Sequence, residues 1–314
     1  VIGNELAQAM QQLGGNLYGV GNRTHAKAVS FAEKYGISKV YDKPEDIFSD
    51  PDVDIVYLST PHNTHIQYLI PALEAGKHVL CEKSITLNSD ELARARKVAE
   101  EKGVVLAEAM TLYHMPVYKK LADLVNSGAL GKLRFVQMNF GSYKEYDMKN
   151  RFFNRSLAGG ALLDIGVYAL SFVRYFMTAQ PDQIASQVLQ APTGVDEQAG
   201  ILLQNKEGEM ATLALSLHAK QPKRGMAAFD KGYIEIYDYP RADTATITYT
   251  EDGRKEVIQE GSTAKALQYE ILDMEQAVAN GGKGMCQEYT KDVMDLMTTI
   301  RKQWGLTYPE EEQA

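Results

Sequence analysis

The first 110 residues alternate strand-like with helix-like segments, and this alternation constrains the fold more than any other feature. The runs at 53–60, 78–83 and 104–110 are mostly apolar, as in strands that are covered on both faces. Helical segments that end at glycines lie between them, for example at 89–103. Because strands joined by single helices form parallel βαβ units, this half predicts a doubly wound α/β sheet.

The pattern changes after about residue 130, where strand-like runs are separated by short turns. These runs lie at 133–143, 184–190, 199–205, 210–218, 233–238 and 244–250. They predict a mostly antiparallel sheet with one covered face, and helices are expected at 158–176, 264–280 and 287–304. A chain of 314 residues exceeds what one core usually supports, so we expect two domains, 1–120 for nucleotide binding and 121–314 with an α+β fold.

Composition argues against several classes of partner. The formal net charge is −8 and no basic cluster stands out, which disfavours nucleic acid and anionic lipid. We see no apolar run near the ~20 residues of a membrane helix, so no membrane association is expected. Cys81 and Cys286 form neither a disulfide framework nor a metal-ligand pattern. A reducing compartment, by default the cytoplasm, is the expected location.

Gly3 directly precedes a helical run, where the third glycine of a G-x-G-x-x-G dinucleotide turn would stand. About 20 residues later, where such folds meet the adenosine ribose, the chain has Asn22 and Arg23 in place of a carboxylate. A carboxylate would repel a 2′-phosphate, whereas Arg can bind it through two hydrogen bonds. The pattern favours NADP, with NAD possible; the alternative is an ordinary helix start and a solvated arginine.

A doubly wound sheet also needs a central strand before its glycine turn, and no strand-like run precedes Gly3. Without that strand, unpaired strand edges would lie in the middle of the sheet. We therefore expect a further strand of about five residues, with the first glycines of the turn, upstream of Val1.

Polar residues follow two of the apolar strands, at the edge where open α/β sheets bind ligands. They are Ser59, Thr60, Pro61, His62, His65, Glu82 and Lys83. A lysine at a strand end is partly desolvated and could orient a substrate hydroxyl, although most lysines are simply solvated. His62 and His65 are three residues apart with no convincing third ligand, so no metal site is predicted.

The apolar helix expected at 158–176 carries one carboxylate, Asp164. An unpaired buried carboxylate is costly. Tyr168 lies four residues on and therefore on the same helix face. This face is typical of a polar pocket wall; the alternative is an aspartate that caps a neighbouring loop and a tyrosine that packs with its hydroxyl satisfied.

Taken together, Gly3, "CEKSIT" and "GGALLDIGVY" resemble the glucose–fructose oxidoreductase / inositol dehydrogenase / MocA (Gfo/Idh/MocA) family, over essentially the whole chain. The resemblance implies an N-terminal Rossmann domain and a C-terminal α+β domain with an open, mostly antiparallel sheet. It also implies hydride transfer between NAD or NADP and a sugar, cyclitol or related diol. Tyr168 stands where many members have histidine and is similar to the branch containing dimeric dihydrodiol dehydrogenase.

The resemblance implies roles for individual residues. Lys83 is similar to the catalytic lysine beside the nicotinamide, Tyr168 to the proton-exchanging residue and Asp164 to the carboxylate that positions the substrate. Arg151 and Phe152 resemble the substrate-binding loop before the helix, and the segment 59–65 resembles a cofactor-lining stretch. In two departures, His62 replaces the usual Asn, and Ser84 replaces the proline that commonly follows Glu-Lys, so its peptide bond either stays trans or holds a strained turn.

The sequence thus predicts an NADP-dependent oxidoreductase acting on a secondary alcohol or hemiacetal of a sugar, cyclitol or 1,2-diol. A dihydrodiol dehydrogenase and a sugar dehydrogenase remain open alternatives. A non-catalytic, NADP-responsive regulator on the same scaffold is disfavoured because Lys83, Asp164 and Tyr168 are all present. Family resemblance also implies a homodimer or higher homo-oligomer formed through the C-terminal sheet.

Overall fold

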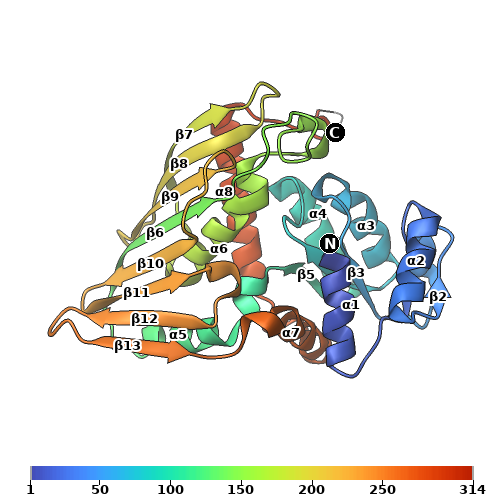
Figure 1. Cartoon of the computed structure of the whole chain (residues 1–314), viewed down its shortest axis with the longest axis horizontal. Helices are drawn as coiled ribbons and strands as arrows, with labels where there is room; N and C mark the ends of the chain where they lie inside the picture. Colours follow the sequence, from blue (N-terminus) through green and yellow to red (C-terminus); the bar gives the residue numbers. More distant parts are fainter. Residues whose placement is uncertain (1, 313–314) are drawn as a thin grey trace. The chain divides into compact units, whose positions relative to one another are not determined.

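The computed structural model describes residues 2–312, so Val1 and the strand expected before it lie outside the described part of the chain (Figure 1). The chain divides into two compact units. The first comprises residues up to Ile85, Asp90–Ala109 and Ala264–Gln287. The second comprises Thr86–Ser89, Met110–Thr263 and the residues from Glu288 onward.

Parallel strands and covering helices build the first unit. Its elements are α1 (Ile2–Gln12), β1 (Gly19–Val20), α2 (His25–Tyr35), β2 (Lys39–Val40), β3 (Ile55–Leu58), α3 (His65–Glu74), β4 (His78–Glu82), α4 (Ser89–Lys102), β5 (Leu106–Ala109) and α7 (Ala266–Asn280). β1 pairs with β2, and β3, β4 and β5 form a second sheet in that order; every pair is parallel. This arrangement confirms the predicted Rossmann-type α/β fold.

α7 belongs to the first unit, whereas the sequence prediction placed it in the domain 121–314. Its residues Leu267 and Ile271 share a buried apolar cluster with Leu6 and Ala9 of α1. An apolar stripe shows that a helix is packed on one side but does not show which partner it packs against. The single predicted boundary near residue 120 therefore differs from the observed division.

The second unit is built on one large sheet. Its main elements are α5 (Pro116–Asn126), β6 (Leu133–Gly141), the π-helical turn η5 (Leu162–Gly166), α6 (Val167–Phe176), β7 (Gln183–Gln190), β8 (Asp196–Gln204), β9 (Met210–Ser216), β10 (Arg224–Phe229), β11 (Gly232–Tyr237), β12 (Thr244–Tyr249), β13 (Lys255–Gln259) and α8 (Gln287–Trp304). The strand order is β13-β12-β11-β10-β6-β9-β8-β7, and only the β6–β9 pair is parallel. The predicted mostly antiparallel sheet is confirmed, with α5, α6 and α8 on one of its faces (Figure 1).

The helix expected at 158–176 begins instead with the π-turn η5 and continues as α6. By length and composition alone, the stretch Arg155–Phe176 is long and apolar enough to cross a membrane. The prediction that the chain has no apolar run of this length was therefore wrong. Most of this stretch is buried inside the protein, as in the core helix of a globular domain. Composition alone is therefore weak evidence for a membrane span here.

Candidate active site

The N-terminus of α1 lies beside the segment that follows β3. A Cβ added to Gly3 would lie 4.0 Å from the Ser59 hydroxyl oxygen and 3.9 Å from the Phe31 ring. These are ordinary van der Waals distances, so close packing of helix and sheet does not require glycine at position 3. Gly3 and Ser59 are nevertheless brought together at the carboxyl edge of β3, where a helix N-terminus favours an anion.

The segment after β1 carries the predicted residues Asn22 and Arg23. Asn22 Oδ1 accepts a hydrogen bond from the Thr24 backbone N–H at 2.9 Å. The Arg23 side chain is exposed, and it makes no hydrogen bond or ion pair within residues 2–312. Its guanidinium is therefore available for a phosphate group.

His65 ties two parts of the predicted site together. Its Nε2 lies 2.8 Å from the Thr60 carbonyl oxygen, and its Nδ1 lies 3.0 Å from that of Ser84 and 3.2 Å from that of Ile85. The side chain is completely buried, and burial lowers the pKa of its imidazole although the carbonyls act in the opposite sense. His65 therefore positions the backbone rather than presenting its ring at a surface.

Lys83 is half-buried and directly follows β4. On one side of it, the Tyr57 hydroxyl donates a hydrogen bond to Glu82 Oε1. On the other side, the Ile85 N–H donates to Glu108 Oε1 at 3.1 Å, and the Lys83–Ser84 peptide bond is cis. A half-buried side-chain contact therefore precedes the lysine, and a buried carboxylate binds the backbone that follows it.

Glu108 was missed at the sequence level. It is buried on β5 within the segment "VVLAEAM", where a lone carboxylate in an apolar strand was a usable signal. Like Asp164 in its apolar helix, Glu108 is a lone carboxylate in an apolar segment, and burying such a group without a partner is costly.

The first unit also offers a group that suits a bound nucleotide. The Thr60 hydroxyl oxygen is buried and has no hydrogen-bond partner within the described residues. Buried polar groups in native proteins are nearly always hydrogen-bonded, so an additional partner at this edge of the sheet is indicated. Pro61 beside it is exposed and His62 is half-buried. The Thr60 hydroxyl and the unpaired guanidinium of Arg23 are hydrogen-bond donors that fit a phosphorylated dinucleotide.

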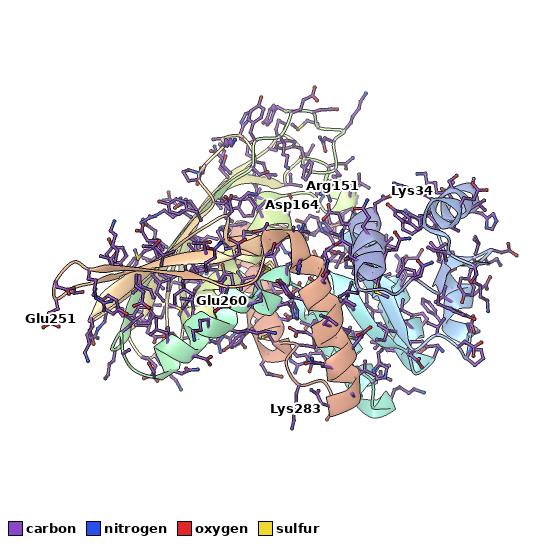
Figure 2. All side chains as sticks on the ribbon, turned by 60° about the horizontal axis from the view of Figure 1, so that its bottom comes forward. Lys34, Arg151, Asp164, Glu251, Glu260 and Lys283 are labelled. Atoms are coloured by element: carbon purple, nitrogen blue, oxygen red, sulfur yellow. The ribbon has the colours of Figure 1, made fainter. Side chains whose placement is uncertain are left out.

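In the second unit, the structure brings together three predicted substrate residues. Asp164 lies on η5 with 12% of its side chain exposed, and its Oδ1 is 3.4 Å from Arg151 Nη2 (Figure 2). The Arg151 guanidinium carbon lies 4.3 Å from the centre of the Phe152 ring. Lys144, which the sequence analysis did not single out, lies 4.2 Å from the same ring centre through its Nζ. The Phe152 ring therefore lies beside two cationic side chains, and one of them, Arg151, pairs with Asp164.

Tyr168 lies in the first turn of α6 and is half-buried. Its ring centre is 6.0 Å from that of Phe140 on β6. Between Asp164 and Tyr168, a Cβ on Gly166 would approach Leu215 Cδ1 of β9 to 2.9 Å. Glycine thus lets this turn lie close to the sheet, which gives the Asp-x-Gly-x-Tyr pattern a physical reason.

No group of three or more His, Cys, Asp or Glu side chains is arranged to hold a metal ion within residues 2–312. The predicted catalytic groups are a lysine in the first unit and a carboxylate and a phenol in the second. With a nicotinamide as hydride carrier, such groups can position a substrate and move its proton.

Comparisons with known proteins agree with this architecture. Residues 1–110 match a model of the oxidoreductase family with an NAD-binding Rossmann fold, and residues 118–237 match the Gfo/Idh/MocA C-terminal domain. The chain is 29% identical over 292 residues to a trans-1,2-dihydrobenzene-1,2-diol dehydrogenase from Xenopus tropicalis, which covers 90% of this chain and 88% of that protein. A mouse protein of the same name is 32% identical over 213 residues, covering 67% of this chain and 63% of its own length.

Solved structures share the fold over nearly the whole chain. An aldose–aldose oxidoreductase from Caulobacter crescentus has a TM-score of 0.83 at 22% identity, covering 95% of this chain and 93% of that one. A mutant 3-ketoreductase from Actinomadura kijaniata, solved with NADP and TDP-benzene, has a TM-score of 0.82 at 22% identity, covering 95% and 92%. The two family models adjoin and together span well over half of the chain. This protein is therefore a nicotinamide-dependent oxidoreductase that belongs to the Gfo/Idh/MocA family.

Proposed function

We propose that this protein transfers a hydride between NADP and a secondary alcohol or hemiacetal of a sugar, cyclitol or 1,2-diol. The observation that carries the proposal is Asp164, a largely buried carboxylate with an oxygen 3.4 Å from Arg151 and with Tyr168 one helical turn away. A carboxylate acceptor next to a phenolic hydroxyl suits a substrate with two neighbouring hydroxyl groups. Relatives named as diol dehydrogenases support the diol reading.

Each residue has a distinct part in this proposal. NADP, when bound, supplies the site that accepts or releases the hydride. Tyr168 exchanges the proton of the reacting hydroxyl. The Lys83 ammonium is the group we assign to orienting the substrate hydroxyl. Asp164 accepts a hydrogen bond from the second hydroxyl, which fixes the carbon that reacts.

The preference for NADP is supported by Arg23, whose exposed guanidinium makes no other ion pair within residues 2–312. Asn22 adds no negative charge that would repel a 2′-phosphate. We therefore assign the 2′-phosphate to Arg23 and the pyrophosphate to the N-terminus of α1.

The substrate is sought by screening sugars, inositols and vicinal diols with NADP and with NAD while following reduced-nicotinamide absorbance. With a confirmed substrate, Lys83→Met is expected to lower kcat by about 100-fold or more while NADP still binds. Lys102→Met, at the end of α4, is the matched control and should keep wild-type turnover. Turnover of Lys83→Met within a few-fold of wild type would remove Lys83 from the mechanism.

We also propose that the protein forms a homo-oligomer through the sheet of the second unit and resides in the cytoplasm. The face of the sheet opposite α6 carries exposed apolar side chains, including Leu202 and Tyr237. For the location, the support is the low cysteine content, since Cys81 and Cys286 are the two cysteines among 314 residues. Fractionation of cells that naturally produce the protein tests the location.

A further inference from the structure

The turn that leads into Asp164 is built on two adjacent glycines, Gly159 and Gly160. Gly160 has a φ of +128°, a conformation that side chains with a Cβ rarely adopt. Its N–H donates to the Phe152 carbonyl at 2.9 Å, and its own carbonyl accepts from the Asp164 N–H at 3.3 Å. Gly160 therefore joins the substrate loop to the backbone of Asp164.

After this turn the backbone follows a π-helical pattern, in which the Val167 N–H donates to the Leu162 carbonyl. A π-turn holds about one residue more per turn than an α-helix, so relaxation to the α pattern would rotate Asp164 relative to Tyr168. Such turns are rare and occur frequently at functional sites. Other groups must therefore stabilise the start of η5.

Asp196, the first residue of β8, is one of these groups. It is completely buried, and its Oδ2 accepts a hydrogen bond from the Leu162 N–H at 2.6 Å. A Cβ on Gly160 would overlap its Oδ1. The carboxyl group thus lies against the turn and caps the N-terminal end of η5.

Tyr308, in the segment after α8, is the second group. It is completely buried, and its hydroxyl donates to the Gly159 carbonyl at 2.7 Å. Its backbone N–H donates to Glu311 Oε2 at 2.8 Å, and the Arg301 guanidinium lies 4.8 Å from its ring centre. The C-terminal segment therefore contacts the glycine turn directly.

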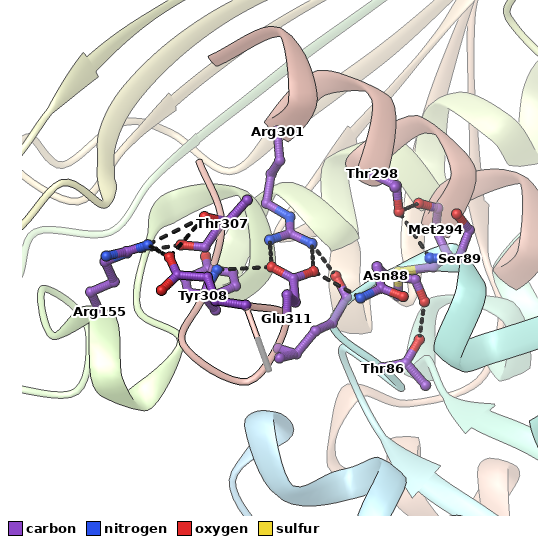
Figure 3. A network of polar contacts seen from close by, with 12 residues as sticks. Thr86, Asn88, Ser89, Arg155, Met294, Thr298, Arg301, Thr307, Tyr308 and Glu311 are labelled. Atoms are coloured by element: carbon purple, nitrogen blue, oxygen red, sulfur yellow. Dashed lines mark hydrogen bonds and ion pairs between the residues drawn. The ribbon is translucent and has the colours of Figure 1, made fainter. Parts of the chain in front are cut away.

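Arg301 connects this segment to the residues that follow Lys83 in sequence. It makes two hydrogen bonds with Glu311, at 2.7 and 2.8 Å, and donates to the Leu87 carbonyl at 2.5 Å (Figure 3). Asn88 donates to the same glutamate at 2.8 Å. This buried network fixes Tyr308, because each charged group in it is paired.

We propose that Asp196 and Tyr308 are positioning residues that fix the Gly159–Gly160 turn and thereby set the orientation of Asp164 toward substrate. The inference rests on the proposed function in one respect, the assignment of Asp164 to a substrate hydroxyl. Neither residue touches the reacting atoms; both act through the backbone of η5. A misplacement of a positioning group by about 1 Å can cost on the order of 100-fold in rate.

The test compares Asp196→Ala, Asp196→Asn and Tyr308→Phe with Glu209→Ala. Glu209 is a matched control because it is also a buried carboxylate that accepts a backbone N–H, that of Thr178 at 2.9 Å, beyond the other end of α6. kcat and KM on the confirmed substrate, the NADP dissociation constant and the melting temperature are measured for each variant. Hydrogen–deuterium exchange of residues 160–168 adds a readout that needs no substrate.

We expect kcat/KM to fall about 10- to 100-fold in Asp196→Ala and in Tyr308→Phe, with partial rescue in Asp196→Asn. Exchange at 160–168 should accelerate in these variants while NADP affinity stays unchanged. Glu209→Ala should lose thermal stability but keep both its kcat/KM and its slow exchange at 160–168. Tyr308→Phe retains the ring and its packing, so it decides the question if Asp196→Ala does not fold.

The proposal is overturned if Tyr308→Phe and Asp196→Ala keep wild-type kinetics and exchange, or if Glu209→Ala affects 160–168 equally. Lys83→Met distinguishes failure of the proposed chemistry from failure of the positioning role of Asp196 and Tyr308. If Lys83→Met is inactive and the positioning variants are unaffected, only the positioning role fails. If Lys83→Met stays active, the proposed chemistry fails, and the exchange data still report on the turn.

Discussion

Asp196 carries an unusual protonation equilibrium for an aspartate. Burial raises the pKa of its carboxyl group from 3.8 to about 7, and the N–H groups of Leu162 and Ala161 and the charge of Arg301 only partly offset this. The groups that face it are Arg301 of α8 and Tyr308 of the C-terminal segment. Because the folded state binds the proton more tightly, the stability from this group is complete below about pH 4 and declines until about pH 7.

Asp196→Asn should remove this pH dependence, because an amide does not titrate. Relative to wild type, we expect the variant to gain stability steadily between pH 4 and pH 7, by at most about 4 kcal/mol for a shift of this size. Denaturant unfolding of both proteins at a series of pH values measures the difference. Parallel stability–pH curves would show that Asp196 does not titrate in this range.

Arg23 gives a second prediction at this scale. If its guanidinium binds the 2′-phosphate, Arg23→Ser should weaken NADP binding by roughly 10-fold or more, because a charge-assisted pair is lost. The affinity of the Arg23→Ser variant for NAD should hardly change. Calorimetric titration with both nucleotides measures these affinities. Lys27 is an exposed cation on α2, so Lys27→Ser controls for the general loss of positive charge. An equal loss for both nucleotides would contradict the assignment.

Among the structural elements, the π-turn η5 depends most on contacts from elsewhere in the chain. We expect Gly160→Ala to destabilise the protein by about 3 kcal/mol or more, since it combines a strained φ with overlap of Asp196. Gly253→Ala is the matched control, because Gly253 also has a positive φ but a Cβ there meets nothing within 4 Å. Gly253→Ala should lower the free energy of unfolding by only ~1 kcal/mol. Equal costs in denaturant unfolding would mean that contact with Asp196 plays no part.

The strands of the first unit could be predicted because their information is local: a short apolar run flanked by polar residues is sufficient for β3 and β4. The π-turn η5 could not be predicted, because Asp196 lies 34 residues after Leu162 and only the folded sheet brings the two residues together. For the same reason, the apolar stripe along α7 did not show that this helix packs against α1. Asp164 was found because it breaks an apolar pattern, and Glu108 breaks one in the same way.

At the scale of the whole molecule, the sheet of the second unit presents a face that its own helices leave open (Figure 1). On β8, Ile201 and Leu203 are almost completely buried, whereas Leu202 between them is 38% exposed. Because side chains alternate along a strand, Leu202 points to the face opposite α6. Exposed apolar residues on the open face of a sheet are typical of an interface between identical subunits.

We therefore expect the wild-type protein to be at least dimeric in light scattering coupled to size-exclusion chromatography. Leu202→Glu should shift it toward the monomer, since each subunit would place an unpaired charge in a buried apolar contact. The circular dichroism spectrum and NADP affinity of this variant should stay unchanged, because position 202 is solvent-exposed in the single chain. Leu272→Glu is the matched control: Leu272 is 39% exposed and lies on α7 of the first unit. A monomeric wild-type protein, or equal dissociation by both variants, would rule out this face as the interface.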